Sequence, residues 1–474
     1  MNPQHHTVLS PDDARARLRS IAERIAAACP HDAWLVGGVV RDALLDRPLE
    51  DIDIAVAGAC EHAARAIAAS LGGTPFPLSD RHGCWRIADS DRQIDVCTIR
   101  GKSIETDLQA RDFTMNAMAV SCSHPETIID PYGGIADLEA GLVRAVGMQA
   151  FDDDPLRLLR AARFAHVFQM KIEAATEQWV RDRTSQLTEP SGERIYAEFC
   201  ALLDAPEQRR GMRLLDDLGV LAAVLPELDA CRGIEQSRFH HLDVFEHTLA
   251  VLDNVEDIVG NTGFYLGEPV HTAQPFGAEG IRMLQLAALL HDSAKPSTRG
   301  THPVTGGVTF VGHDNAGVRI VDAVCDRWAT SNRIRDGVKH LVRTHLELGM
   351  LLHGPMDARA RWRFLRSMDS YAAEAIVLSV ADRLATAGVD DRRRWVRAHM
   401  ECARAVWADH WTEHAEGIPR PFLDGREIAE LAGVEPGPVV GQLVRALAEE
   451  QAVGAVTSSD EARAFIARSV PERA

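Results

Sequence analysis

Up to about Phe113, short runs dominated by apolar residues alternate with longer amphipathic stretches. Four of the runs predict strands: residues 34–36, 52–56, 83–87 and 93–99. Ser10, Pro11 and Asp13 predict the start of a helix, because serine caps a first turn, proline fits there and an acid is favoured near the N-terminus. The pattern indicates a mixed α/β domain at the start of the chain.

After Phe113 the pattern becomes almost wholly helical, with Ala, Leu, Arg and Glu dominating. Residues 260–280 contain Gly and Pro and have little periodicity, which predicts a surface loop or insertion. The predicted fold class is therefore α+β, with an α/β head followed by a long all-α body. A chain of 474 residues exceeds the size of a single hydrophobic core, so we expect two to four domains.

Charge limits the kinds of partner that the chain can bind. The sequence has 51 Lys and Arg against 69 Asp and Glu, a formal net charge of −18, which argues against a general nucleic-acid coat protein. A polynucleotide partner therefore requires a locally basic groove.

Cysteine usage and hydropathy bear on the compartment. The nine cysteines occur singly without a CxxC pair, which predicts neither a disulfide framework nor a zinc knuckle. No apolar run reaches eighteen residues, and no charged stretch followed by an apolar one begins the chain. These features predict a cytoplasmic protein in a reducing compartment, with no membrane association.

The head contains a set of acids suited to phosphoryl transfer. Asp51 and Asp53 lie two apart at the start of a predicted strand, so both carboxylates face one side, and Asp95 in the next run offers a third oxygen ligand. Such acids hold Mg²⁺, which bridges the attacking hydroxyl and the nucleotide phosphates. Alone the pair is more often a solvated turn, but Gly37 and Gly38 just upstream form a strand-to-helix turn able to cradle a triphosphate. The alternative for these glycines is a simple tight turn.

Six motifs over residues 34–199 resemble those of class II tRNA nucleotidyltransferases, in the CCA-adding enzyme and poly(A) polymerase superfamily. They are LVGGVVRD, DIDIAV, ARDFTMNAMAV, DPYGGIADL, DDPLRLLRAARFA and ERIYAEF, in the order seen in that family. The resemblance implies a polymerase-β-like nucleotidyltransferase head in which Asp51 and Asp53 bind the catalytic metal. It also implies a nucleotide-binding set, namely Gly37, Gly38, Arg41, Arg111, Asp112 and Asn116.

The motif DDPLRLLRAARFA has a physical interpretation of its own. Offsets of three predict that Asp154, Arg157 and Arg160 share one helix face, with Arg163 a turn further on. An acid beside an arginine can read the hydrogen-bonding edge of a nucleobase, as the family does to select C and A. The alternative is an ordinary salt-bridged helix face.

The chain departs from the family pattern at two places. Ala110 precedes Arg111 where relatives have a second arginine, which removes one phosphate contact or ion pair. The link GKSIET, between IDVCTIR and DLQARDFT, is shorter than the flexible loop of full CCA-adding relatives. In this family a shortened loop is associated with adding CC without the terminal A.

A second constellation lies in the helical body. Its members follow the H, HD, H, H, D order of an HD domain: His247, His291, Asp292, His313, His345 and Asp382. Imidazole and carboxylate ligands suit a divalent transition metal such as Mn, Ni, Fe or Zn, which activates water for phosphate-ester hydrolysis. Lys295, just after the doublet, is placed to meet a phosphate. The alternative is a degenerate domain with a purely structural role.

The expected boundaries follow from these motifs. We expect four parts, namely a catalytic head (1–145), a helical neck that binds nucleobase and RNA (146–228), an HD metal-binding domain (229–400) and a helical tail (401–474). The tail resembles the segment that closes bacterial class II enzymes, through LDGREI and PGPVVG. Arginines at 359–366 and 392–397, interleaved with tryptophan, either track an RNA backbone or form solvated helix faces.

The predicted reaction is addition of C, A or both to the 3′ end of tRNA from CTP and ATP, with release of pyrophosphate. A CC-adding enzyme is the narrower form of this prediction. The alternatives are a poly(A) polymerase, an HD-domain phosphohydrolase whose head merely binds nucleotide, and a noncatalytic RNA-binding protein. The expected partners are tRNA, CTP and ATP, and no protein partner is implied.

Overall fold

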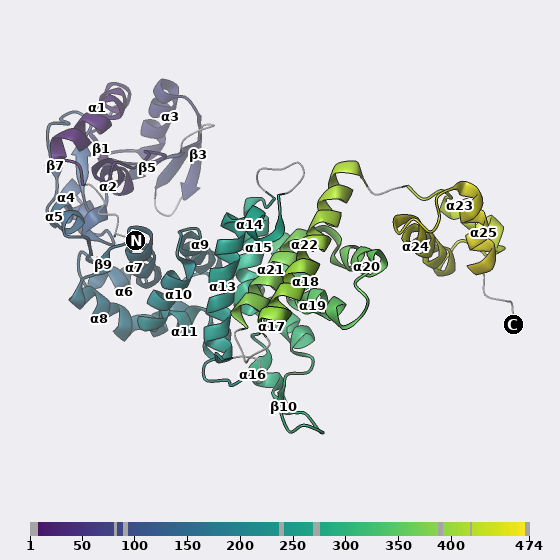
Figure 1. The fold of residues 1–474 in the computed structure, drawn as a ribbon. Helices are drawn as coiled ribbons and strands as arrows, with labels where there is room; N and C mark the ends of the chain where they lie inside the picture. Colours follow the sequence, from purple (N-terminus) through teal and green to yellow (C-terminus); the bar gives the residue numbers. More distant parts are fainter. Residues whose placement is uncertain are drawn as a thin grey trace. The chain divides into compact units, whose positions relative to one another are not determined.

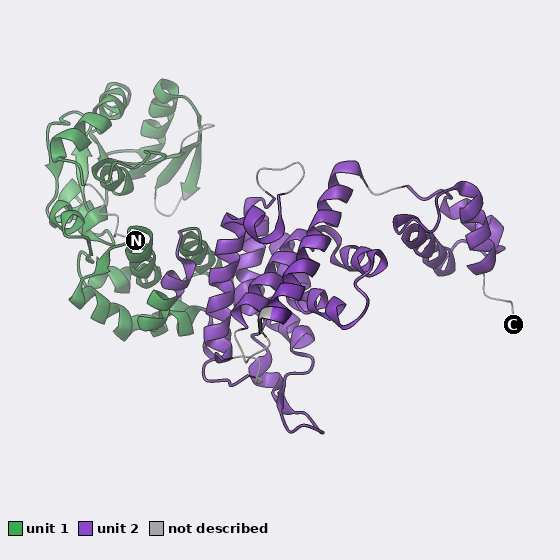
Figure 2. Cartoon of the chain, in the orientation of Figure 1, with its two compact units in different colours: residues 1–205, 213–224 green, residues 206–212, 225–474 purple. Residues whose placement is uncertain are grey.

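The computed structural model describes residues 8–79, 83–88, 93–236, 241–268, 275–386, 392–417 and 420–469. The chain forms two compact units (Figure 2). The first comprises Met1–Ala205 with Arg213–Val224, and the second comprises Pro206–Met212 with Leu225–Ala474. The fold confirms the predicted class, an α/β head followed by a mostly helical body.

A seven-stranded mixed sheet forms the head, in the order β3-β4-β5-β2-β1-β6-β7 (Figure 1). Its strands are β1 (Ala33–Val36), β2 (Asp51–Val56), β3 (Thr74–Ser79), β4 (Cys84–Ala88), β5 (Gln93–Thr98), β6 (Ala119–Ser121) and β7 (Ile128–Ile129). Strands β2 and β5 run parallel, and their register sets Asp53 opposite Asp95. The register therefore places the three predicted acids in adjacent strands.

Helices cover the head sheet and connect its strands. They are α1 (Pro11–Ala28), α2 (Gly38–Leu44), α3 (Cys60–Leu71), α4 (Ile104–Gln109), α5 (Gly134–Glu139) and the short 3-10 helix η1 (Thr114–Asn116). Helix α1 begins as predicted, because the Ser10 side chain accepts a hydrogen bond from the backbone N–H of Asp13. Helices α1 and α3 pack side by side against the sheet (Figure 1).

The sequence analysis missed three strands of the sheet. Strands β6 and β7 follow Phe113, in a region that is otherwise mostly helical as predicted; they have three and two residues, too few to produce a periodic pattern. Strand β3 was not predicted because it contains Pro75 and Pro77, which cannot donate hydrogen bonds to a neighbour. Its position at the edge of the sheet removes that requirement on one side.

The rest of the first unit is mainly helical. It contains β8 (Leu142–Val143), α6 (Gln149–Asp153), α7 (Leu156–Val167), β9 (Lys171–Ile172), α8 (Ala174–Arg183), η2 (Thr184–Thr188), α9 (Gly192–Leu203) and α11 (Val220–Val224). Helix α10 (Gln208–Asp217) spans the boundary between the units. The expectation that Asp154 shares a helix face with Arg157 and Arg160 is wrong. Asp154 is extended, and α7 begins only after Pro155, because a residue before proline is disfavoured in helical geometry.

The second unit begins with the helices that carry the HD residues. These are α12 (Pro226–Asp229), α13 (Val244–Gly260), α14 (Thr262–Leu266), α15 (Ala278–Leu290), α16 (Lys295–Thr298), α17 (His313–Arg327), α18 (Asn332–Thr344), α19 (Glu347–Met350) and α21 (Ala372–Ala385). Helices α13, α15, α18 and α21 pack on one another and form its core. A hairpin of β10 (Gly300–Thr301) and β11 (Val308–Thr309) precedes α17.

The remaining elements of this unit are η3 (Leu351–His353), α20 (Ala358–Met368), η4 (Asp369–Tyr371), α22 (Arg392–Glu416), α23 (Gly425–Ala432), α24 (Pro438–Ala452) and α25 (Ser459–Ser469). The last three helices bury a small core of their own around Leu447 and Ile466. The loop expected at 260–280 is partly helical, since it includes α14 and the start of α15, while residues 269–274 lie outside the described part. Among the described helices, none combines the length and apolarity needed to span a bilayer.

The arginines of α20 are held by carboxylates of the same unit. Arg359 forms hydrogen bonds with Glu449 and Glu450 at 2.7–2.8 Å, and Arg363 pairs with Glu449. Arg361 pairs with Asp409 at 2.6 Å, and Arg366 with Glu413. These guanidinium groups fix α20 to α22 and α24, so α20 presents paired rather than free positive charge.

Candidate active site and metal centre

A cavity of about 770 Å³ in the first unit collects the predicted nucleotide-binding residues. It is lined by Gly37, Gly38, Arg41, Asp51, Asp53, Arg111, Asp112, Asn116, Asp154, Arg157, Arg160 and Arg163, and further by Asp42, Arg47, Pro48, Glu50, Arg100, Phe164, Val167 and Phe168. Segments far apart in sequence thus supply one site, which Asp95 alone of the predicted head residues does not line.

The turn between β1 and α2 requires glycine. Gly37 has φ +73°, and a Cβ atom there would lie 2.5 Å from Nη1 of Arg111 and 3.4 Å from Oδ2 of Asp53. Any side chain would therefore fill the space between the arginine and the acid and adopt a conformation that favours glycine. The glycine keeps the cavity open beside Asp53.

Asp51 is exposed, whereas Asp53 is partly buried on the same face of β2. Burial, together with the neighbouring charges of Asp95 and Asp51, raises the pKa of the Asp53 carboxyl to about 6 against the opposing effect of Arg111. A buried carboxylate with this charge imbalance fits a divalent cation, which would offset the repulsion between the acids.

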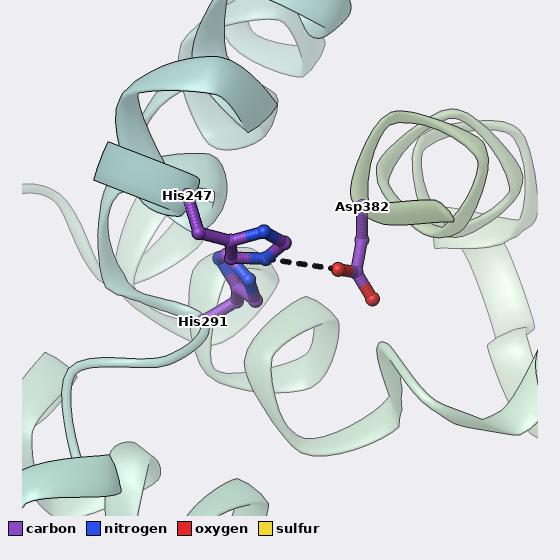
Figure 3. Close-up of side chains that lie close together, drawn as sticks. All are labelled: His247, His291 and Asp382. Carbon is purple, nitrogen blue, oxygen red and sulfur yellow. Dashed lines mark ion pairs between the residues drawn. The ribbon is translucent and has the colours of Figure 1, made fainter. Parts of the chain in front are cut away.

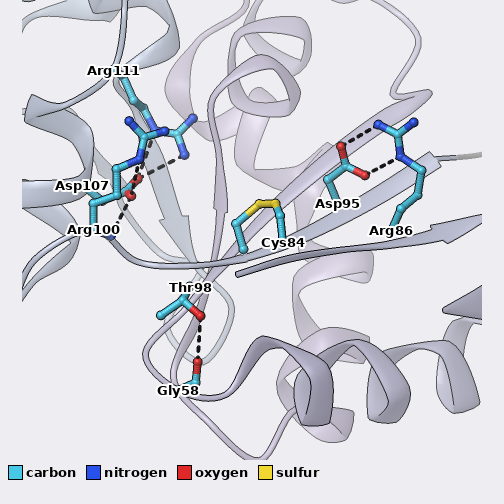
Figure 4. The surroundings of a disulfide bond; sticks show 9 residues. Gly58, Cys84, Arg86, Asp95, Thr98, Arg100, Asp107 and Arg111 are labelled. Atoms are coloured by element: carbon cyan, nitrogen blue, oxygen red, sulfur yellow. Dashed lines mark hydrogen bonds and ion pairs between the residues drawn. A yellow bond between two sulfur atoms is a disulfide. The ribbon is translucent and has the colours of Figure 1, made fainter. Parts of the chain in front are cut away.

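Asp95 is already engaged by a base. Arg86 donates from Nε and Nη2 to its two carboxylate oxygens at 2.7 and 2.9 Å, across β4 and β5 (Figure 4). Such a bidentate pair is strong and directional, so each oxygen of Asp95 accepts one hydrogen bond from Arg86 and keeps a second lone pair. The sequence did not indicate this partner, since Arg86 lies in a predicted strand with no motif.

The same strands join two cysteines in a single disulfide, which the predicted absence of a disulfide framework did not anticipate. Cys84 and Cys97 are opposite each other in the antiparallel register, with a Cα–Cα distance of 4.3 Å, and they are disulfide-bonded (Figure 4). The other seven cysteines are not part of this disulfide. Sequence spacing missed the pair because strand register, not local spacing, makes them neighbours.

Arg111 is oriented by an acid one helical turn earlier. Its Nε and Nη2 atoms donate to Oδ2 of buried Asp107 at 3.2 and 3.1 Å, and the backbone N–H of Arg100 donates to Oδ1 (Figure 4). The side chain of Arg100 donates to the carbonyl of Ala110 at 3.0 Å. The sequence motifs gave no role to Arg100 or Asp107, which the structure adds to the cavity wall and its support.

Asp112 is the centre of a buried polar network. It accepts hydrogen bonds from Asn116 and from the backbone of Phe113, and it pairs with Arg160 at 2.8 Å. Burial by itself would raise the pKa of this carboxyl, but Arg160 and the hydrogen bonds lower it to about 2. Asn116 accepts in turn from Arg41 at 2.7 Å, so the network connects α7 to α2.

The two residues expected to read the base lie in the cavity wall but have other partners. Asp154 pairs with Arg194 of α9 at 2.7 Å. Arg157 donates to the carbonyls of Ala110 at 2.9 Å and of Ala150 at 3.1 Å. Any contact with a nucleobase therefore requires these side chains to share or exchange hydrogen bonds.

The second unit places all six predicted HD residues together. His247 of α13, His291 at the end of α15 and Asp382 of α21 offer ligand atoms that lie within 4.8 Å of one another (Figure 3). His247 Nε2 lies 3.0 Å from Oδ1 of Asp382. The nearby charges of His247 and His291 hold the pKa of Asp382 well below its usual range although burial opposes this shift.

A second group of ligand atoms comprises Asp292, His313 and His345, also within 4.8 Å. Oδ2 of Asp292 lies 3.2 Å from His291 Nε2, while Oδ1 lies 3.4 Å from His313 Nε2. Asp292 therefore stands between the two groups, with one oxygen directed to each. These residues would hold one or two divalent ions, with Asp292 available to both groups.

Backbone carbonyls orient three of the imidazole rings. The Nδ1 atoms of His291, His313 and His345 lie 2.7–2.9 Å from carbonyl oxygens, which directs each Nε2 atom inward. If each Nδ1 donates, the Nε2 atoms of His313 and His345 face each other as lone pairs at 3.2 Å. A cation between the two nitrogen atoms would interact with both lone pairs, so these side chains suit a metal ion.

Lys295 also reaches this centre. Its Nζ atom lies 2.6 Å from Oδ2 of Asp292 and 2.6 Å from Oε1 of Gln236. The Lys295 ammonium therefore pairs with the Asp292 carboxylate and does not point to open solvent. The sequence identified Lys295 but not Gln236, which lies outside the HD motif.

Comparison with known protein families agrees with both sites. The family model described as "Poly A polymerase head domain" matches residues 33–105 and 101–144. "Probable RNA and SrmB- binding site of polymerase A" matches residues 169–232, and "HD domain" matches residues 244–387. These matches cover the cavity residues up to Asn116 and all six residues of the histidine and aspartate centre, while the cavity residues from Asp154 to Phe168 lie between the first two matches.

Two relatives span almost the whole chain. The A-adding tRNA nucleotidyltransferase of Deinococcus radiodurans is 36% identical over 94% of this chain and 96% of its own length. The CC-adding tRNA nucleotidyltransferase of Thermus thermophilus is 32% identical over 92% and 93%. The chain belongs to the tRNA nucleotidyltransferase family, and it is a nucleotidyltransferase that extends tRNA 3′ ends.

Solved structures share the fold. A CCA-adding enzyme in complex with ATP aligns with a TM-score of 0.65 at 19% identity, over 98% of this chain and 97% of that one. The Thermotoga maritima CCA-adding enzyme complexed with tRNA aligns with a TM-score of 0.62 at 19% identity, over 98% and 97%. The agreement in fold extends across both units.

The Gly37 turn yields a matched pair of variants. Gly37→Ala places a methyl group against Arg111, whereas Gly72→Ala imposes a similar positive φ of +92° where no atom lies within 4 Å. Both should lose about 1–3 kcal/mol of unfolding free energy from backbone strain. Only Gly37→Ala should lower the rate of nucleotide addition, by roughly tenfold or more. A single primer-extension assay measures the rate of nucleotide addition by both variants. Equal losses of rate would contradict a role of the Gly37 turn in holding the triphosphate.

The raised pKa of Asp53 predicts that removal of its carboxylate stabilises the metal-free protein. Asp53→Asn removes a carboxylate whose pKa is raised to about 6, so the metal-free variant should be more stable than wild type above pH 6, by up to about 3 kcal/mol. The difference should shrink as pH falls from 6 towards 4, where the wild-type carboxyl is protonated in the folded state and partly protonated in the unfolded state. Urea unfolding in EDTA at pH 8 and pH 4 measures this. A variant that is less stable at pH 8 would refute the buried-charge account.

Proposed function

We propose that this enzyme adds C residues to the 3′ end of tRNA and stops before the terminal A. The terminal hydroxyl of the tRNA attacks the α-phosphate of CTP, the bond to the β-phosphate breaks and pyrophosphate leaves. The proposal that the enzyme adds C rather than A rests on the short link between β5 and α4. The wider statement, addition of C, A or both, follows from the family.

In this proposal the acids of β2 hold the metal. Asp51 and Asp53 bind Mg²⁺, which when bound neutralises charge on the phosphates and lowers the pKa of the attacking hydroxyl. The partly buried Asp53 and the exposed Asp51 present their carboxylates on one face, as metal binding requires. Asp95 is the third acid, and it acts beside Asp53 while Arg86 orients its carboxylate.

The cavity arginines and glycines hold the nucleotide. The backbone of Gly37 and Gly38 and the guanidinium of Arg111 receive the triphosphate, while Asn116 and Arg41 lie by the sugar. Asp112, Arg160 and Arg163 support this wall through their ion pairs, the last with Glu198 at 2.7 Å. Asp154 and Arg157 select the base. All of these residues except Glu198 line one cavity.

The link of residues 99–103 is attached to the helix that follows it. The backbone N–H of Arg100 donates to Asp107, Ser103 Oγ lies 3.3 Å from Thr106 Oγ1, and a Cβ at Gly101 would meet the Thr106 side chain at 2.5 Å. These contacts leave the link little freedom compared with a long exposed loop. The segment is an anchored connection.

The anchored link bears on base selection through one carbonyl. The oxygen of Ala110 accepts from Arg100 of the link and from Arg157 of the base-reading segment. Asp154 is separately held by Arg194. A change from C to A requires this segment to move, so fixing Arg157 through a short link favours a single base.

Overall identity does not choose between the two nucleotides. The relative from Deinococcus is named as A-adding and that from Thermus as CC-adding, at 36% and 32% identity. The local link, not the global similarity, is therefore the basis of the proposal. Addition of a long A tail would instead indicate a poly(A) polymerase.

A second activity is supported by the HD centre. Six ligands in two groups, with Asp292 between them, suit one or two divalent ions such as Mn, Ni, Fe or Zn. A bound ion of this kind would activate water for hydrolysis of phosphate esters. Lys295 lies beside the Asp292 carboxylate and would neutralise a phosphate oxygen.

The division of labour follows the sequence segments. We assign nucleotide addition to residues 1–145, base reading and RNA binding to 146–228, the second metal centre to 229–400 and the C-terminal helical tail to 401–474. A tRNA-processing enzyme of this kind acts in the cytoplasm, where tRNA ends are made and repaired.

The nucleotide choice is tested by product length. Purified enzyme with tRNA lacking its last three residues should extend it by two nucleotides with CTP, and by the same two with CTP plus ATP, because the fixed segment does not accept A. Electrophoresis at single-nucleotide resolution gives the answer. A third residue with both nucleotides would overturn CC-specific addition and leave the transferase intact, while long products with ATP alone would show a poly(A) polymerase.

The HD centre is tested by metal content and hydrolysis. Wild type should carry up to two transition-metal ions in this centre and hydrolyse a nucleoside 2′,3′-cyclic phosphate, whereas His291→Ala should lose both while nucleotide addition stays within about twofold. Elemental analysis and chromatography of the products measure these effects, and unfolding of both proteins controls for folding. A wild-type protein with neither metal nor hydrolysis would assign the domain a structural role.

A further inference from the structure

Seven arginines line the head cavity, and they differ in how their donors are used. The set is Arg41, Arg47, Arg100, Arg111, Arg157, Arg160 and Arg163. Five have carboxylate partners, with Asp42, Asp107, Asp112 and Glu198 as acceptors. Arg157 donates to backbone carbonyls. Within the described part of the chain, Arg47 alone of the seven has a guanidinium with neither an ion pair nor a hydrogen bond.

Arg47 is nevertheless held in place. Its guanidinium carbon lies 4.9 Å from the centroid of the buried Phe168 ring, which Arg41 approaches to 4.7 Å. Its backbone carbonyl accepts a hydrogen bond of 2.7 Å from Arg17 of α1. A cation–π contact orients a guanidinium without using its N–H donors, so Arg47 presents its donors to the cavity.

The position of Arg47 distinguishes it from the triphosphate-binding arginines. The segment between α2 and β2 carries Arg47, Pro48 and Glu50 into the cavity wall and continues into Asp51. Gly37 and Arg111 adjoin Asp53, which lies about 6–7 Å further along the strand. Arg47 therefore enters the cavity wall from the chain segment that leads into Asp51.

The Asp53 end and the Asp51 end of the strand correspond to the two substrates of the transfer, the nucleotide and the tRNA. In an in-line displacement the attacking hydroxyl and the departing pyrophosphate lie on opposite sides of the reacting phosphorus. Gly37, Gly38 and Arg111 take the triphosphate at the Asp53 end. The acceptor strand then enters at the Asp51 end, where a planar guanidinium matches the two free oxygens of a phosphodiester.

We propose that Arg47 binds the 3′-terminal phosphodiester of the tRNA acceptor strand and thereby positions its terminal hydroxyl. This inference rests on the nucleotidyltransferase function but not on whether C or A is added. It also identifies a local cation for RNA on a chain whose net charge is −18. Arg47 acts on the acceptor and leaves the affinity for nucleotide unchanged.

The test compares Arg47→Ala with Arg47→Lys and with a control, Arg19→Ala, whose residue is 63% exposed on α1 and pairs with Glu23. Wild type and variants extend tRNA lacking its 3′ end, with KM measured separately for tRNA and for the added nucleotide. Arg47→Ala should raise KM for tRNA about fivefold to tenfold, with KM for nucleotide unchanged. Removing one phosphate contact should also reduce the slope of log affinity against log salt by about 0.7.

Arg47→Lys should restore the salt slope, because it keeps the charge, and should recover part of the affinity. Arg19→Ala should match wild type in every measurement. A rise in KM for nucleotide with KM for tRNA unchanged would overturn the proposal, as would an unchanged salt slope accompanied by a lower melting temperature, which would make Arg47 a packing residue for Phe168. A wild type that extends no tRNA would refute the transferase function itself.

Discussion

A carboxylate removed from water needs a compensating positive charge, and the head depends on where that charge comes from. Two aspartates in one cavity differ in the source of this positive charge. Asp112 has Arg160 and hydrogen bonds from the protein, which lower its pKa to about 2. At Asp53, burial and the acidic neighbours Asp95 and Asp51 outweigh Arg111 and raise the pKa to about 6. The first is thus complete as folded, whereas the second is prepared for a cation that arrives with the substrate.

The same principle organises the centre of the second unit. Asp292 is buried among four histidines and Lys295, and these positive or polarisable groups hold its pKa well below the usual range against the effect of burial. Carbonyl groups orient the imidazoles so that their Nε2 atoms converge. In each unit the backbone fixes side chains around a charge that a metal would balance, although the scaffolds are unrelated.

Sequence patterns predicted the residues of both sites better than their contacts. The order of the motifs pointed to the residues of the head cavity and to all six HD residues, because residue type and order along the chain can be read from the sequence alone. The Arg86–Asp95 pair and the Cys84–Cys97 disulfide were missed, since both depend on strand register. The helix face assumed for Asp154 failed at Pro155, where helical periodicity stops. Local periodicity therefore predicts elements, while partners that meet across strands require the fold.

The central claim is that the acids of β2 and the glycine turn form one nucleotide and metal site. Crystals grown with Mn²⁺ and a non-hydrolysable CTP analogue, examined by anomalous diffraction, test it most directly. The account predicts manganese bound by Asp51 and Asp53, with the triphosphate along Gly37 and Gly38. Manganese confined to the histidine centre, with the analogue bound away from the β2 acids, would contradict it.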